Sequence, residues 1–174
     1  LPDGTPLPEV AAILTYLAHA EPGLRRGPTL WIHDWPGFYR WTVFLAVNIY
    51  EGVLRRSYTQ RYAMPLAQAA PSRARTLPDD IDAVVALAVC QGASQRIHSA
   101  FQCLERETAG RAFLLGDRMS PADIFLAMLY AWYNQKPDLP KCTWITTQVA
   151  THPVIRPIWK RNFEQFLDFK WHAL

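Results

Sequence analysis

Residues 113–132 read FLLGDRMSPADIFLAMLYAW, and this stretch decides the fold. Ser120 is a favourable N-cap, Pro121 suits the first helical position, and Asp123 stands where its carboxylate can return a hydrogen bond to the cap. The residues that follow are apolar on all sides, which indicates a buried helix. The carboxylate of Asp123 could also be read as a buried catalytic acid, but its spacing from Ser120 already accounts for it. The sequence therefore predicts a capping box at Ser120 and Asp123 that begins an interior helix.

A longer helix is expected over residues 38–58, directly after the pair Pro36-Gly37. At 100° per residue this segment carries two apolar stripes instead of one. One stripe consists of Tyr39, Val43, Val47, Tyr50, Leu54 and Tyr58, and the other of Trp41, Phe44, Leu45 and Gly52. A helix that is apolar on two sides is expected to lie centrally in a bundle.

The remaining segments predict an all-α fold, a bundle of about five helices preceded by one strand and one helix. The expected elements are a strand end and turn over residues 1–7, a short helix over 8–19, an exposed connection over 21–34, an irregular stretch over 63–77 and helices over 79–108, 141–150 and 153–171. Prolines at 137 and 140 are expected to end the helix that follows the capping box.

Composition excludes several classes of protein. The 174 residues are 50% hydrophobic, 13% aromatic and 19% charged, unlike a disordered chain. The net charge of +3 is too small to imply a nucleic-acid or membrane partner. No apolar run reaches the about 18–20 residues that cross a bilayer, and the first residues lack a secretory signal pattern. We therefore expect a cytoplasmic protein.

Motifs for metal binding and for common catalytic classes are absent. Cys90, Cys103 and Cys142 include no CxxC pair, which argues against a disulfide framework and against a four-cysteine zinc site. The five histidines have no HxxxH or HExxH spacing, so no metal is expected. A GxSxG turn, a P-loop and a GxGxxG loop are also missing, which leaves hydrolase, kinase and dinucleotide-binding functions without support.

Separated segments of the chain resemble the glutathione S-transferase family. LPDGTPLPEVAAILTYL, residues 1–17, resembles the last strand of that family's thioredoxin-like domain, the turn with its glutathione-binding Glu-Ser or Gln-Ser pair, and the next helix. LLGDRMSPADIFLA, residues 114–127, resembles the capping-box signature of its C-terminal domain. RWTVFLAVNIYEG, residues 40–52, further resembles the fourth helix of bacterial members, notably of the beta class.

This resemblance implies a domain organisation. Residues 1–19 would be the last strand and helix of a thioredoxin-like domain, residues 20–35 a linker, and residues 36–174 the helical C-terminal domain. In the family the catalytic Tyr, Ser or Cys belongs to the earlier part of the first domain, so the catalytic residue is unknown here and expected upstream of Leu1. The resemblance also implies glutathione as co-substrate, a small apolar electrophile and a homodimer.

Glu9 and Val10 are the glutathione-binding residues that the resemblance implies. Val10 stands where the family has a serine, so the backbone N–H for the γ-glutamyl carboxylate is kept and the hydroxyl is lost. Glu9 can meet the γ-glutamyl ammonium as a charge-assisted partner. The alternative for Glu9 is an ordinary carboxylate favoured by the dipole of the following helix.

The resemblance also implies an apolar substrate pocket. Its expected residues are Tyr39, Val43, Val47, Tyr50 and Trp132. Tyr50 stands where beta-class relatives have a histidine, Trp132 matches an aromatic residue at the end of the buried helix, and Val43 replaces a polar residue. The alternative is that these side chains simply fill the core.

Two functions follow as hypotheses. The first is a glutathione S-transferase-like enzyme that joins the glutathione thiolate to an apolar electrophile or uses it in a related thiol reaction. The second is a non-catalytic module of the same fold that binds a protein partner or an apolar ligand, and the loss of the serine hydroxyl at Val10 favours it.

Overall fold

The protein is helical throughout the part that the structure describes. The structure is a computed structural model that describes residues 1–21, 32–63, 81–133 and 139–168, with side chains of the last range as far as residue 163. Its elements are α1 (Val10–Ala20), α3 (Trp35–Phe44), the π-helix η1 (Leu45–Tyr50), α4 (Glu51–Ser57), the 3₁₀ turn η2 (Thr59–Arg61), α6 (Ile81–Glu107), α7 (Pro121–Trp132), α8 (Pro140–Thr151) and α9 (Arg156–Asp168). These ranges contain no strand, which confirms the all-α prediction.

The strand end predicted within residues 1–7 is not formed, although the predicted turn is. Gly4 has a φ of +84°, and its N–H donates to the Leu1 carbonyl over 2.9 Å. The Thr5 N–H donates to Oδ1 of Asp3 over 2.9 Å and tightens the same turn. A strand requires ladder hydrogen bonds to a neighbouring strand, and the described residues supply no such neighbour.

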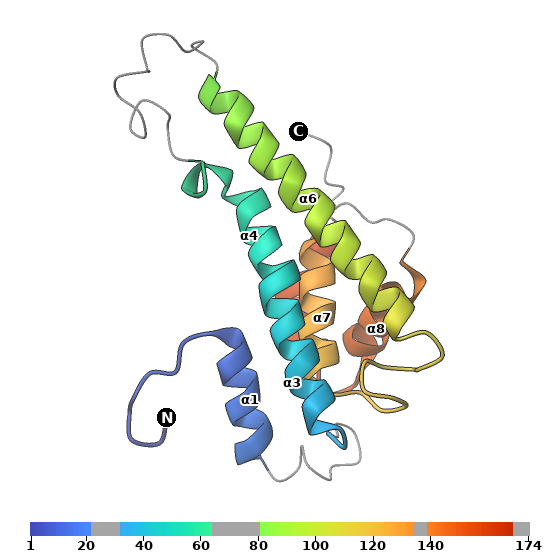
Figure 1. Cartoon of the computed structure of the whole chain (residues 1–174). Coiled ribbons are helices and arrows are strands. Elements are labelled where there is room, and N and C mark those ends of the chain that lie inside the picture. The colour runs from blue at the N-terminus through green and yellow to red at the C-terminus, as the bar shows by residue number, and fades with distance from the viewer. Residues whose placement is uncertain (22–31, 64–80, 134–138, 169–174) are drawn as a thin grey trace.

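The long helix predicted over residues 38–58 begins three residues earlier, at Trp35. Asp34 is its N-cap, and Oδ1 of Asp34 accepts a hydrogen bond from the Gly37 N–H over 2.9 Å. Pro36 lies in the first turn, where its missing N–H costs nothing. The segments α3, η1 and α4 then continue into one another as a single rod (Figure 1).

The middle of this rod is a π-helix, which the sequence analysis did not predict. At its end the Glu51 N–H donates to the Ala46 carbonyl, five residues back. Trp41, Leu45 and Gly52 of one predicted stripe are buried in the core, together with Phe38 and Ile49, which were assigned to neither stripe. The other stripe leaves Tyr39, Val43 and Val47 exposed, whereas its Tyr50 is half-buried against the core. The predicted central helix is therefore covered on one apolar side and only partly on the other.

The predicted capping box at the start of α7 is present. Asp123 is fully buried, and its Oδ2 accepts hydrogen bonds from the Ser120 N–H over 2.8 Å and from the Ser120 hydroxyl over 2.7 Å. Its Oδ1 accepts a third bond, from the Leu114 N–H over 2.8 Å. The carboxylate therefore fixes the N-cap and also ties the preceding loop to the helix.

Helix α7 is the interior helix of the bundle, as the sequence predicted. Leu126, Ala127 and Leu129 are completely buried. The helix packs against α3 and η1 on one side and against α8 and α9 on the other, and in Figure 1 it lies between the α3–α4 rod and α8. Burial of its apolar surface at about 25 cal/mol per Å² makes α7 the element on which α1, α3, η1, α8 and α9 pack.

The N-terminus of α8 is capped by a residue far away in the sequence. Glu105 of α6 accepts hydrogen bonds from the Cys142 N–H over 2.8 Å and from the Lys141 N–H over 3.1 Å. The local N-cap residue, Leu139, has no side chain that could do this. Glu105 therefore satisfies two amides that would otherwise lack partners and joins α6 to α8.

The other predicted helices are formed with shifted ends. Helix α6 begins at Ile81 and ends at Glu107, α8 spans Pro140–Thr151, and α9 begins at Arg156, after a turn at residues 153–155. Some predicted segments lie mostly outside the described residues. They are the connection at 21–34, the irregular stretch at 63–77, positions 79–80 and the start of the break after α7.

Replacing Asp123 by Asn tests the capping box. An amide has only one acceptor oxygen, so either orientation of Asn leaves one buried N–H, of Leu114 or of Ser120, facing an NH₂ group. We expect the free energy of unfolding at pH 8, where Asp123 is ionised, to fall by about 2 kcal/mol in urea titrations. Asp117→Asn, at an exposed site in the same loop, is the matched control and should change it by less than about 0.5 kcal/mol. Equal effects of the two substitutions would contradict the assignment.

The carboxyl group of Asp123 gives the fold a defined pH dependence. Burial raises its pKa to about 6, and the hydrogen bonds from Leu114 and Ser120 offset only part of that shift. The neutral acid is thus favoured in the folded state, so its contribution to stability is full below about pH 4 and is lost as pH rises through 6. We expect the carboxyl carbon of Asp123 to titrate near pH 6 in NMR spectra, and a midpoint near 4 would refute this.

Candidate functional site

The N-terminus of α1 has a strained backbone. Glu9, the residue before the helix, has φ 71° and ψ 116°, and it is the only described non-glycine residue with a positive φ. Such a conformation costs of order 1–3 kcal/mol and persists where the surroundings impose it, often at binding sites. The Glu9 carboxylate is exposed and does not cap the helix.

Val10 and the first turn of α1 provide backbone donors beside Glu9. The Val10 side chain is half-buried and packs against the core, which leaves its backbone at the surface end of the helix. The first N–H groups of a helix lack partners within the helix and attract carboxylates. Val10 has no hydroxyl to add to these donors, as the sequence analysis anticipated.

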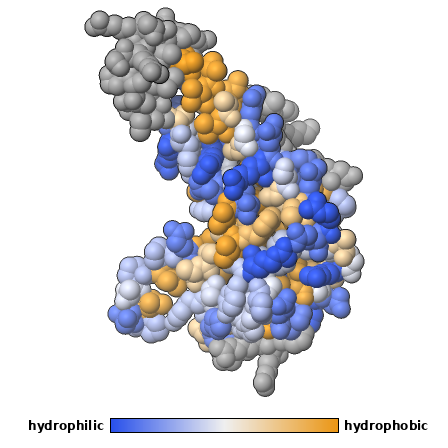
Figure 2. Space-filling model, viewed as in Figure 1, coloured by the Kyte–Doolittle hydropathy of each residue, from blue (hydrophilic) through white to orange (hydrophobic). Residues whose placement is uncertain are grey.

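An apolar stripe runs along the exposed side of the rod. Tyr39, Val43 and Val47 follow one another at intervals of four residues and are 38%, 56% and 52% exposed. We call these three residues the α3 stripe. Figure 2 shows hydrophobic residues at the notch between the projecting N-terminal segment and the body of the molecule. Exposed apolar surface of this kind is typical of ligand or partner contacts.

The other two residues of the predicted pocket lie together farther along. Tyr50 of η1 and Trp132 of α7 are half-buried, and their ring centroids are 6.2 Å apart with an interplanar angle of 33°. The π-helix η1 has more residues per turn than an α-helix, so the direction in which the Tyr50 side chain points differs from the one that a periodicity of 3.6 residues predicts. The structure thus groups the five predicted residues into the α3 stripe and a Tyr50–Trp132 pair.

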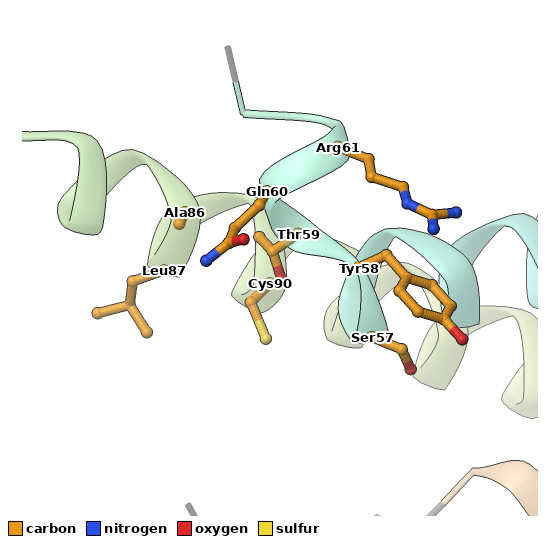
Figure 3. Close-up of a pocket in the computed structure, with 8 residues that line it drawn as sticks. All are labelled: Ser57, Tyr58, Thr59, Gln60, Arg61, Ala86, Leu87 and Cys90. Atoms are coloured by element: carbon orange, nitrogen blue, oxygen red, sulfur yellow. The ribbon is translucent and has the colours of Figure 1, made fainter. Parts of the chain in front are cut away.

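Two surface hollows found among the described residues lie elsewhere. The hollow in Figure 3 is formed by the end of α4, η2 and the first half of α6, and its residues are Ser57, Tyr58, Thr59, Gln60, Arg61, Ala86, Leu87 and Cys90. The other lies between the loop before α7 and the end of α8, where Phe113, Met119 and His152 contribute. Neither includes a predicted pocket residue, so the substrate pocket stays a prediction.

An aromatic cluster that the sequence analysis missed joins α1 to α3. Nε2 of His19 lies 2.6 Å from the hydroxyl oxygen of Tyr39. The imidazole of His19 is stacked on Trp35, with 4.2 Å between centroids and 15° between planes. The spacing of Trp35 and Tyr39, four residues apart on one helix, could have shown that they share a face. Nothing in the sequence indicated that His19 would reach them.

Two of the three cysteine thiols are held in their neutral form. A hydrogen bond to Glu107 raises the pKa of Cys103, whose Sγ lies 3.1 Å from Oε1 of that residue. Glu107 is itself paired with Arg40, and this hydrogen bond lowers the pKa of its carboxyl group. Burial raises the pKa of the Cys142 thiol well above its usual value. Neither thiol is therefore a reactive thiolate at neutral pH.

The described residues contain no group of three or more His, Cys, Asp or Glu side chains arranged to hold a metal ion. Among the helices that the structure describes, none combines the length and the apolar character needed to cross a bilayer. The glutathione-binding role of Glu9 and Val10 stays a prediction.

Comparison with known proteins identifies the fold. The chain is similar to the crystal structure of a glutathione S-transferase from Actinobacillus pleuropneumoniae, with a TM-score of 0.60 and 19% sequence identity over 98% of this chain and 70% of that chain. A scan against protein-family models found no match, and a search of curated proteins found none either. The chain therefore has a glutathione S-transferase-like fold, with a helical bundle of the C-terminal-domain type.

Proposed function

We propose that this protein is a glutathione S-transferase-like enzyme that joins the glutathione thiolate to an apolar electrophile, or uses glutathione in a related thiol reaction. The observation that carries the proposal is the strained backbone of Glu9 at the N-terminus of α1, in a chain with this fold. Strain of this kind is retained where function requires it. The exposed apolar residues of the α3 stripe support the proposal that the second substrate is apolar.

Glutathione would bind at the N-terminus of α1. The Glu9 carboxylate would pair with the γ-glutamyl ammonium, and the backbone N–H of Val10 would donate to the γ-glutamyl carboxylate. One neutral hydrogen bond is worth about 1 kcal/mol, so the missing hydroxyl at Val10 weakens this site without abolishing it. The thiol would then be directed toward the rod.

The electrophile would bind along the α3 stripe and the Tyr50–Trp132 pair. Valine side chains at 43 and 47 give an apolar surface, and the hydroxyls of Tyr39 and Tyr50 supply a small number of polar groups, as in most small-molecule sites. Catalysis would come from holding the thiolate and the electrophile close together and excluding water.

The domain organisation belongs to the same proposal. Residues 1–19 would close a thioredoxin-like domain, residues 20–35 would link it to the helical domain at 36–174, and the residue that activates the thiol would lie upstream of Leu1. We further propose a beta-class-like subtype, a homodimer and a cytoplasmic location. No metal is needed by this chemistry.

A second candidate function is a non-catalytic module that binds an apolar ligand or a protein partner through the α3 stripe. The observation that favours it is Val10, which removes a hydroxyl from the proposed glutathione site. The two functions differ in one respect that can be measured directly, the affinity for glutathione.

Calorimetric titration of the full-length protein with glutathione tests the first function. We expect Glu9→Gln to weaken binding about 10-fold, because a charge-assisted bond to the ammonium is lost. Val10→Ser should strengthen it about 5-fold, because the hydroxyl adds one hydrogen bond of about 1 kcal/mol. Glu21→Gln, at the opposite end of α1, is the matched control. Absence of glutathione binding together with no turnover of aryl halides, epoxides or enones would refute the enzyme.

Charge placed in the α3 stripe tests the electrophile site. Val47→Asp should lower kcat/KM for an apolar electrophile at least about 10-fold, because a carboxylate must then be desolvated beside the substrate. The affinity for glutathione should change less than about 2-fold. Val154→Asp, at a more exposed site before α9, is the control and should change neither quantity. If both variants behave alike, the stripe does not bind the electrophile.

A further inference from the structure

Helix α1 is held on the bundle by few contacts. Ala18 is its only buried residue, and Val10 and Leu14 pack partly against the core. Ile13 and Leu17 remain exposed. Among the described elements, α1 packs mainly against α3 and α7. Its position therefore depends strongly on the polar and aromatic contacts at its C-terminal end.

His19 makes those contacts. The 2.6 Å contact with the Tyr39 hydroxyl and the stack on Trp35 both reach from the last turn of α1 to α3. Trp35 in turn meets the buried ring of Phe38 edge-on, with 5.9 Å between centroids. His19 is thus connected through two rings to the core of the bundle.

The contact between His19 and Tyr39 can form in either direction. A ring nitrogen without a proton accepts the Tyr39 hydroxyl proton, and one that carries a proton donates it to the Tyr39 oxygen. We call this contact and the stack on Trp35 together the His19 tie.

The two helices run antiparallel and side by side (Figure 1), so the tie at one end sets the separation at the other. Val10 precedes His19 by nine residues, about 13 Å of helix. The same length of rod measured forward from Tyr39 ends near Val47. Val10 therefore lies at about the same level along the rod as the far end of the α3 stripe, while the contacts of α1 with the rod are made mainly at α3.

We infer that His19 is a positioning residue that fixes α1 on α3 and so sets the distance between glutathione at Glu9 and Val10 and an electrophile on the α3 stripe. The inference rests on the proposed function. His19 touches neither substrate and acts through Tyr39 and Trp35. Because misplacement of bound reactants by about 1 Å can cost up to about 100-fold in rate, a residue of this kind affects turnover more than affinity.

Three substitutions in the full-length protein separate the two parts of the tie. His19→Ala removes both, and kcat should fall about 10-fold while the dissociation constant of glutathione changes less than about 2-fold. His19→Gln keeps a hydrogen-bonding group, His19→Phe keeps a ring for the stack, and each should restore part of kcat. His98→Ala, a histidine of α6 outside the cluster, is the matched control and should leave kcat unchanged.

Amide hydrogen exchange supplies a readout that does not depend on catalysis. His19→Ala should accelerate exchange within Val10–Ala20 about 10-fold and leave the amides of α7 unchanged. Unchanged exchange and unchanged kcat in His19→Ala would overturn the inference, and so would a parallel loss of glutathione affinity. If the wild-type protein neither binds nor uses glutathione, the proposed function fails, and unchanged exchange would then refute the tie itself.

Discussion

The rest of this structure depends on the buried carboxyl group of Asp123 and its hydrogen bonds to Leu114 and Ser120. Its two oxygens accept bonds from Leu114 and from both the backbone and hydroxyl of Ser120, and so determine where α7 begins. A buried carboxyl group is destabilising unless it is hydrogen-bonded, and Asp123 has all three of these bonds. With α7 started correctly, its apolar surface can be covered by α3 and η1 on one side and α8 and α9 on the other.

The parts of the fold that could be predicted are those set by residues close together in the sequence. Ser120 and Asp123 are three residues apart, so the capping box and the buried helix followed from spacing alone. The cap of α8 could not be found in this way, because Glu105 lies 36 residues before the first amide that it binds. The π-turn η1 also escaped prediction, since it depends on how Tyr50 and its neighbours pack rather than on their helical propensity.

The candidate site shows the same division. Glu9 and the α3 stripe were selected by resemblance and by periodicity, and the structure adds the strain at Glu9 and the exposure of the stripe. The contact between His19 and Tyr39 joins two helices across twenty residues of chain, and no local sequence pattern predicts it. This contact connects the proposed glutathione site on α1 with the proposed electrophile site on α3. In this proposal the distance between the two bound substrates depends on how α1 is held on α3.

The central claim, that the N-terminus of α1 is a glutathione site facing the α3 stripe, is tested most directly by NMR. Glutathione would be titrated into the isotopically labelled full-length protein while backbone amide shifts are followed. The account predicts that the largest changes occur at Val10 and the next residues of α1, with smaller ones around Val47. Changes confined to the hollow formed by α4, η2 and α6, or no changes at all, would contradict it.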